Sequence, residues 1–293
     1  MREYRFVTLD VFTDRRFGGN QLAVFPDASG LSAQQMQMLA AEFNLSESTF
    51  VFPPENPANT ARVRIFHRTA EMPFAGHPTI GTAYVVGAGE NSDLLRLEQK
   101  AGLVEVRLER DADGIIQRAS LDAPQPLSTG SDVDAELVAQ AIGIAPAAIV
   151  TSTHPPVVAS VGVEFVIVEI EREALAAAVP DLPAFRRAAA AHPGSGTRFS
   201  VFLYSRDGNK VRARMFAPIS GTWEDPATGS ANAAMVALVL SRTGQDSLAL
   251  EVTQGVEMGR PSRLKVEARR TADGIRSRAT GQCVEVLSGI AKV

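Results

Sequence analysis

The stretch Trp223–Ala231 reads Trp-Glu-Asp-Pro-Ala-Thr-Gly-Ser-Ala, and an earlier stretch, Phe74–Ala83, reads Phe-Ala-Gly-His-Pro-Thr-Ile-Gly-Thr-Ala. Both contain Pro-x-x-Gly-(Thr/Ser)-Ala, and a side chain that can exchange a proton, His77 or Asp225, stands directly before the proline. Each stretch follows a strand-like run of residues. The repeat indicates two halves of similar build, each of which directs the start of a helix toward one shared cleft.

The helices expected after these two motifs have almost no polar face. Ala231–Leu240 is apolar almost all round, and Ile80–Val86 is nearly so. A helix without a polar face is buried on all sides. Because most of the other patterned segments alternate like strands, the sequence predicts an α+β fold in which a sheet curls around each central helix. A further helix is expected over Ala33–Phe43, capped by Ser32.

The chain has 293 residues and a mass of 31.2 kDa, with 45% hydrophobic and 21% charged residues. This length favours two domains over a single core. The proline-rich segment Asp122–Pro126 is the best candidate linker, so the expected domains are 1–123 and 124–279. The net charge of −4 offers no basic field for a phosphate backbone, and we expect no nucleic-acid partner.

Cys283 is the single cysteine of the chain, which excludes an intrachain disulfide and a cluster of thiolate ligands. No apolar run reaches the roughly 18 residues that a membrane span needs. The first ten residues alternate like a strand and lack the apolar centre of a signal peptide. We therefore expect a cytoplasmic protein without a membrane partner.

Proline suits the first position of a helix, so His77 and Asp225 are predicted to be the N-caps of the two motif helices. The backbone amides that follow, including those of Thr228, Gly229 and Ser230, would lie in a first turn and could bind a small carboxylate. The plainer alternative is that an aspartate before a proline is a helix cap without any chemistry. The recurrence of the whole frame in both halves favours a site.

The remaining polar residues offer weaker signals. His67, His154 and His192 have no metal-ligand spacing and are expected in loops, so we predict no metal site. No glycine-rich nucleotide motif is present, and we expect no cofactor. Ser230 could serve as a nucleophile, but Thr-Gly-Ser-Ala differs from the Gly-x-Ser-x-Gly turn of hydrolases and is more typical of a ligand donor. A carboxylate placed like Glu47, where a helix gives way to a strand, is most often simply solvated.

Five motifs, in order, resemble the phenazine biosynthesis PhzF-like family. They are Asp10–Thr13 with Gly18-Gly19-Asn20, Leu45–Phe50, Pro73–Thr79, Glu224–Ala231, and Gln254-Gly255 with Met258–Ser262. The resemblance implies the diaminopimelate-epimerase-like fold, with two pseudo-symmetric domains, each a curled, barrel-like sheet around a central helix, and an active site in the cleft between them. It also implies that a final strand near 280–293 returns to the N-terminal half and that the protein is a homodimer.

The resemblance further implies a cofactor-independent isomerase that moves a proton on a small unsaturated or amino/hydroxy carboxylic acid, such as a dihydro-hydroxyanthranilate. Glu47 would be the acid/base, His77, Asp225 and Ser230 would bind and polarise the substrate, and Gly76 and Gly229 would supply backbone contacts. Epimerases of this fold use two cysteines, and neither motif here has one. Two alternatives stay open: a serine-type hydrolase using Ser230, His77 and Asp225, and a relative that binds carboxylates without catalysis.

Overall fold

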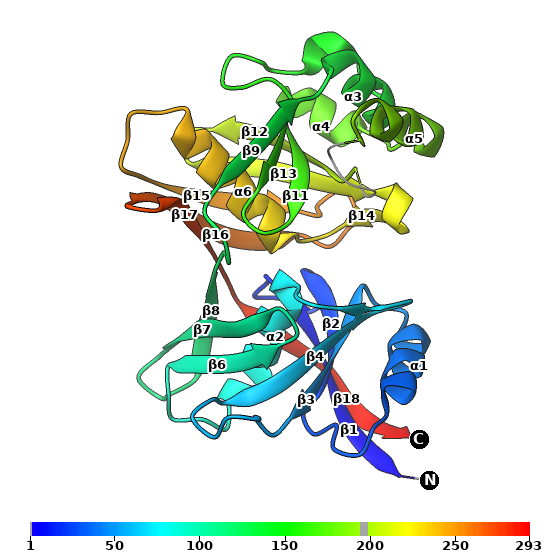
Figure 1. Cartoon of the computed structure of the whole chain (residues 1–293), viewed down its shortest axis with the longest axis vertical. Coiled ribbons are helices and arrows are strands. Elements are labelled where there is room, and N and C mark those ends of the chain that lie inside the picture. Colours follow the sequence, from blue (N-terminus) through cyan, green and yellow to red (C-terminus); the bar gives the residue numbers. More distant parts are fainter. Residues whose placement is uncertain (1, 194–198) are drawn as a thin grey trace. The chain divides into compact units, whose positions relative to one another are not determined.

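The computed structural model describes residues 2–193 and 199–293, and its contacts group the chain into two compact units (Figure 1). Unit 1 comprises Met1–Leu121 and Thr280–Val293, and unit 2 comprises Asp122–Ala279. The chain therefore leaves unit 1 after Leu121 and returns to it at Thr280, so that unit 1 is built from two separate segments of sequence.

The strands of unit 1 form one curled sheet. They are β1 (Glu3–Val11), β2 (Asn20–Phe25), β3 (Glu47–Phe52), β4 (Ala61–His67), β5 (Glu71–Met72), β6 (Leu94–Gln99), β7 (Gly102–Arg110), β8 (Ile116–Asp122) and β18 (Cys283–Lys292). β1 lies between β18 and β2, antiparallel to both. The pairings β2–β3 and β4–β6 are parallel, and β3–β4, β4–β5, β6–β7 and β7–β8 are antiparallel.

Helix α2 (Gly76–Gly87) lies inside this curl and contacts β1, β2, β3, β6 and β7 (Figure 1). The packing is close: a Cβ on Gly81 would stand 2.5 Å from Leu22 Cδ2 and 2.8 Å from Val11 Cγ2, so a side chain at this position would force these neighbours to shift. The expectation of a central helix wrapped by a sheet is confirmed for this unit.

Helix α1 (Ala33–Phe43) covers the outer face of the same sheet, against β3 and β4. It begins and ends where the sequence predicts. Ser32 accepts a hydrogen bond from the Gln35 amide, and the Gln35 side chain accepts one from the Ser32 amide, which forms a complete capping box. The helix packs into an apolar cluster with Phe25, Phe50 and Phe66.

Unit 2 repeats this plan. Its strands are β9 (Ser128–Asp132), β10 (Val157–Ser160), β11 (Glu164–Glu169), β12 (Val201–Asp207), β13 (Lys210–Ala217), β14 (Thr222–Asp225), β15 (Ser247–Gln254), β16 (Ser262–Thr271) and β17 (Gly274–Gly281). The pairings β11–β12 and β13–β15 are parallel, and β12–β13, β13–β14 and β15–β16 are antiparallel. In this pattern β3, β4, β5 and β6 of unit 1 correspond to β12, β13, β14 and β15.

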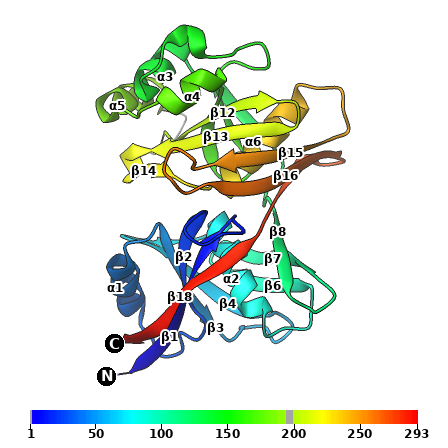
Figure 2. The ribbon, with the colours of Figure 1, turned by 180° about the vertical axis from the view of Figure 1, so that it is seen from behind.

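Helix α6 (Gly229–Ser241) is the central helix of unit 2 and contacts β10, β11, β15 and β16. All of its residues except Ser230 and Ser241 are buried, as its apolar sequence predicts. On the outer face, α3 (Ala135–Ile142), α4 (Arg172–Ala177) and α5 (Leu182–Ala191) contribute to an apolar cluster with the sheet (Figure 2).

The predicted N-caps of both central helices are wrong. Helix α2 starts at Gly76 with Ala75 as its N-cap, which places His77 second and Pro78 third in the helix. Helix α6 starts at Gly229 with Thr228 as its N-cap, so Asp225 lies three residues before the cap and ends β14 instead. Pro78 lies in the first turn of α2, whereas Pro226 lies two residues before the N-cap of α6, so a proline indicates a nearby helix start without fixing the first residue.

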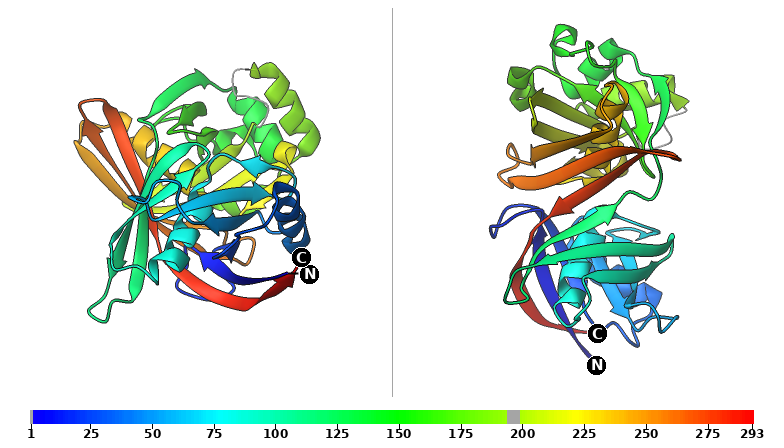
Figure 3. Two further views of the ribbon diagram at one scale, coloured as in Figure 1. Left: turned by 60° about the horizontal axis from the view of Figure 1, so that its bottom comes forward. Right: turned by 90° about the vertical axis from the view of Figure 1, so that its left-hand side faces the viewer.

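The pairing of β1 with β18 extends to the residues next to these strands. The backbone amides of Arg2 and Val293 each donate a hydrogen bond to the other residue's carbonyl, at 2.8 and 2.9 Å, so β1 and β18 run side by side along their length (Figure 3). Among the described residues, no helix combines the length and the apolar character that crossing a membrane would require.

Candidate active site

Glu47 and His77 lie together in unit 1. Glu47 is the first residue of β3, and its register partner on β4 is His67. Oε2 of Glu47 lies 3.5 Å from Nε2 of His77, and their side chains are only 14% and 7% exposed. This distance is longer than an ordinary hydrogen bond, and Nε2 makes none to the described residues. The carboxylate and the imidazole thus face each other without an ordinary hydrogen bond between them.

The imidazole of His77 is uncharged near neutral pH. Burial lowers its pKa from 6.5 to about 3, against the opposing effect of a hydrogen bond with the Gln21 backbone. The contact with Glu47 is therefore one between a carboxyl group and a neutral ring. On the other side of the ring, Nδ1 lies 3.3 Å from Nδ2 of Asn20, which is itself buried. Which of these two atoms donates depends on the ring tautomer, and Nε2 is the nitrogen that faces Glu47.

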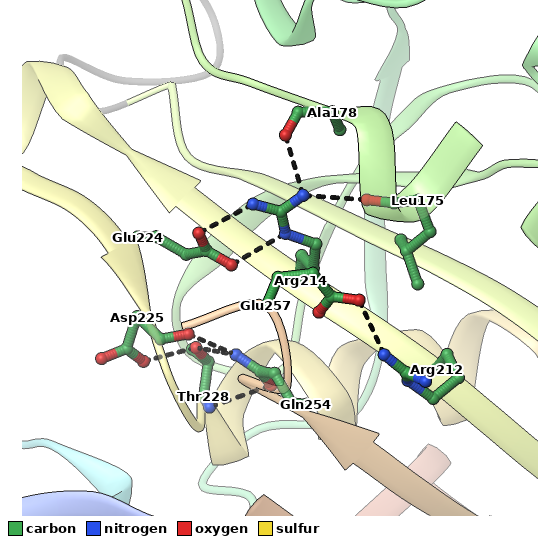
Figure 4. A network of polar contacts seen from close by, with 9 residues as sticks. All are labelled: Leu175, Ala178, Arg212, Arg214, Glu224, Asp225, Thr228, Gln254 and Glu257. Carbon is green, nitrogen blue, oxygen red and sulfur yellow. Dashed lines mark hydrogen bonds and ion pairs between the residues drawn. The ribbon is translucent and has the colours of Figure 1, made fainter. Parts of the chain in front are cut away.

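Asp225 lies in unit 2, at the end of β14, and is 7% exposed. Its Oδ2 accepts a hydrogen bond of 2.5 Å from the Thr228 hydroxyl (Figure 4). Because Asp225, Pro226 and Ala227 precede the helix, this contact folds the carboxylate back over the N-cap of α6. The hydroxyl of Thr228 is therefore committed to Asp225, although its place in the substrate-binding set stays a prediction.

Gln254, the last residue of β15, is fully buried beneath this turn. Its Nε2 donates to the Asp225 carbonyl at 2.8 Å and to the Thr228 hydroxyl at 3.1 Å. Its Oε1 accepts from the Thr228 amide at 3.2 Å and from Nδ2 of Asn232 at 2.8 Å. Gln254 belongs to one of the family motifs in the sequence, but no role was predicted for it.

The strand that carries Asp225 is anchored from behind by a buried ion pair. Arg214 on β13 makes two parallel hydrogen bonds to Glu224, at 2.8 and 2.9 Å (Figure 4). Its remaining nitrogen donates to the carbonyls of Leu175 and Ala178, both at 2.8 Å. The paired geometry satisfies a guanidinium that is only 6% exposed, and it fixes the residue directly before Asp225.

The other predicted site residues lie at the starts of the central helices. Gly76 is the first residue of α2, and Gly229 and Ser230 are the first two of α6. Amides in a first helical turn have no partner within the helix, so these positions could hold an anion. The structure thus groups Glu47 with His77, and Asp225 with the start of α6. The shared cleft stays a prediction from the sequence.

The structure also places two of the other histidines, one of them next to Glu47. His67 is the last residue of β4. His154 precedes β10 as expected of a loop residue, but it is buried and its Nε2 lies 2.8 Å from the Tyr204 hydroxyl. Within residues 2–193 and 199–293 no group of three or more His, Cys, Asp or Glu side chains is arranged to hold a metal ion.

Comparison with known proteins places these features in context. A family model for phenazine biosynthesis-like proteins matches residues 9–289. The chain is 40% identical over 275 residues to a trans-2,3-dihydro-3-hydroxyanthranilate isomerase of Pseudomonas aeruginosa, with 93% of each chain covered. It resembles the crystal structure of a PhzF-family phenazine biosynthesis protein of Bacillus anthracis over 100% of each chain, with a TM-score of 0.89 and 24% identity.

The fold also extends to a more distant enzyme, a hydroxyproline epimerase from Agrobacterium vitis, with a TM-score of 0.64 and 14% identity over 99% of this chain and 92% of that one. The predicted α+β, epimerase-like fold is confirmed by these likenesses. The similarity to a named isomerase supports the predicted isomerase class and does not support the serine-hydrolase alternative.

Proposed function

The chain belongs to the phenazine biosynthesis-like protein family, and from that premise we propose that it isomerises a small unsaturated or amino/hydroxy carboxylic acid related to trans-2,3-dihydro-3-hydroxyanthranilate. The observation that carries the proposal is the pair of Glu47 and His77, a largely buried carboxyl group 3.5 Å from a neutral imidazole. Such a pair can move a proton without a cofactor.

In the proposed reaction, the Glu47 carboxylate removes a proton from a carbon next to the unsaturated system of the substrate. The electron pair left behind is delocalised over that system, and Glu47 returns the proton to a different carbon. No atom is gained or lost, so the product is an isomer. His77 stays neutral throughout and offers hydrogen bonding beside the carbon that reacts.

Asp225 and the start of α6 would hold the polar groups of the substrate. The amides of Gly229 and Ser230 suit a carboxylate, because they lie in the first turn of a helix of 13 residues. The Asp225 carboxylate suits an amino or hydroxyl group, to which it can accept a hydrogen bond. We propose that both sets of residues serve the same reaction.

Replacing Glu47 by Gln tests the mechanism, because an amide of the same shape cannot accept the proton from carbon. With trans-2,3-dihydro-3-hydroxyanthranilate in D2O, we expect turnover and deuterium incorporation at carbon to fall by a factor on the order of 100 to 10,000. Binding of the substrate should persist and can be measured by calorimetry. Glu42→Gln, on the exposed face of α1, is the matched control.

Unchanged turnover in the Glu47→Gln variant would remove Glu47 from the mechanism. If the wild-type protein does not act on this probe, the same exchange assay across small unsaturated, amino and hydroxy carboxylic acids tests the wider substrate class. Absence of exchange with every member would contradict the proposed function.

We also propose that the protein acts as a homodimer in the cytoplasm. Support comes from the family resemblance and from the use of a single, buried cysteine. Sedimentation equilibrium should give twice the chain mass of 31.2 kDa, and a mass equal to one chain would contradict the dimer.

A further inference from the structure

We propose that Gln254 is a positioning residue for the Asp225 carboxylate and that it acts through the hydroxyl of Thr228. This inference rests on the proposed function, in which Asp225 holds the substrate. It concerns how the fold aims that carboxylate, which the family relationship alone does not explain.

The direction of each hydrogen bond around Gln254 follows from groups whose roles are fixed. The backbone amide of Thr228 can only donate, so the atom of Gln254 that faces it must be Oε1. The backbone carbonyl of Thr228 can only accept, and Nδ2 of Asn232 donates to it at 2.9 Å. That contact orients the Asn232 amide, whose nitrogen also reaches Oε1 of Gln254. Two independent contacts therefore agree on the orientation of the Gln254 amide.

This orientation determines where the Thr228 hydroxyl sends its proton. The Nε2 of Gln254 faces Oγ1 of Thr228 and must donate to it. Oγ1 thus receives one hydrogen bond, and its own proton is free to point toward Oδ2 of Asp225, 2.5 Å away. The hydrogen bonds therefore run from the Gln254 amide to the Thr228 hydroxyl and from that hydroxyl to the Asp225 carboxylate. A short bond from a hydroxyl favours the ionised carboxylate and fixes its rotation.

Gln254 also holds the backbone of the same residue. Its second Nε2 proton goes to the Asp225 carbonyl, so side chain and main chain of Asp225 are both tied to one buried amide. Gly255 adds a steric constraint, because its φ is +74° and a Cβ there would lie 2.6 Å from the Pro226 carbonyl oxygen. The end of β15 therefore packs directly against the turn that carries Asp225 (Figure 4).

Unit 1 contains a similar glutamine–threonine pair, but its threonine hydroxyl does not donate to an acidic side chain. Gln99 ends β6, the strand that corresponds to β15, and its Nε2 donates to the Thr79 hydroxyl at 2.8 Å. That hydroxyl donates to the backbone carbonyl of Ala75 at 2.7 Å, not to His77. A buried glutamine fixes the start of the central helix in both units, and only in unit 2 does the connection continue to an acidic side chain.

The test uses Thr228→Val, which removes the hydroxyl and keeps the shape, with Thr228→Ser as the variant that restores it. With trans-2,3-dihydro-3-hydroxyanthranilate as the probe, we expect Thr228→Val to lower kcat by at least about tenfold, with a smaller change in KM, because the carboxylate is misdirected. Thr228→Ser should recover most of the lost kcat. Gln254→Leu should show the same loss if it folds.

A loss of stability alone would not produce this pattern. Thr243→Val provides the comparison, because the Thr243 hydroxyl donates to the Leu240 carbonyl near the far end of α6 and accepts from the Gln245 amide. It should change the melting temperature without the fall in kcat. If Thr228→Val keeps the wild-type kcat, or if Thr228→Ser is no better than Thr228→Val, the inference is wrong.

A crystal structure of Thr228→Val separates this inference from the proposed function. We expect the Asp225 carboxylate to rotate away from its wild-type position, whether or not the probe is a substrate. An unmoved carboxylate would overturn the positioning role, whereas a moved carboxylate in a protein without any exchange activity would contradict only the proposed function.

Discussion

A neutral, buried histidine makes the stability of this protein sensitive to acid. The pKa of His77 is about 3 in the folded chain and about 6.5 in the unfolded chain. Between these two values the imidazole is therefore protonated in the unfolded chain and neutral in the folded one. Stability from this residue is intact above pH 6.5 and declines as the pH falls toward 3. We expect roughly 3 kcal/mol of loss between about pH 7 and pH 4.5.

Urea unfolding of wild type and His77→Gln at several pH values measures this effect. The variant should lose less stability on acidification, because glutamine does not titrate. His192→Gln serves as the control, since His192 is the C-cap of α5 in unit 2 and stacks on Phe199. Equal acid sensitivity of the wild type and the His77 variant would contradict the assignment.

Single site residues could be predicted where a family motif could be matched position by position. Glu47 and His77 were named in this way, and they do lie together. Asn20 and Gln254 stood in the same motifs without a role, because their effect depends on contacts with residues 57 and 22 to 29 positions away. Such contacts follow from the folded chain and cannot be read from local spacing.

At the scale of elements, α6 offers the clearest prediction about the core. Leu238 is fully buried in a helix that strands contact on several sides, so Leu238→Ala should leave a cavity. We expect the free energy of unfolding to fall by about 2 to 5 kcal/mol. Denaturant titration measures the change, and Met38→Ala on α1, where the methionine is 63% exposed, should have little effect. Similar losses in both variants would argue against a tightly packed central helix.

The contrast between α1 and the two central helices shows what decides a helix boundary. Ser32 and Gln35 cap α1 through contacts three residues apart, and its start was predicted correctly. Asp225 was predicted as a cap, but Gln254 at the end of β15 binds the Asp225 carbonyl and the Thr228 amide. These hydrogen bonds hold the residues between Asp225 and Thr228 in a turn that precedes the helix. Local capping is visible in sequence, whereas a boundary imposed by a distant side chain is not.

At the scale of the whole molecule, the internal repeat was enough to predict two halves with central helices, and the matching strand pairings bear this out. The identity of neighbouring strands could not be derived from the pattern alone. Parallel pairs such as β2–β3 and β4–β6 join strands separated by a helix or a long connection, and alternation of apolar residues does not specify which strands meet.

Removal of residues 280–293 should affect the two units differently. β1 pairs with both β2 and β18, and this deletion strips β18 from one side of β1 while leaving the described strands β9 to β16 of unit 2 complete. Hydrogen exchange should show lost protection in β1 with protection retained in α6. Uniform loss of protection in both units would contradict independent cores.

The pairing of β1 with β18 also has a consequence for synthesis on the ribosome. β1 is translated before unit 2, yet its neighbour β18 is translated only after every residue of unit 2. During that interval one edge of β1 is open, and an open strand edge invites pairing with other chains. The later unit in the sequence can therefore complete its core before the earlier one, and nascent chains stalled before Thr280 should be the form most prone to aggregate.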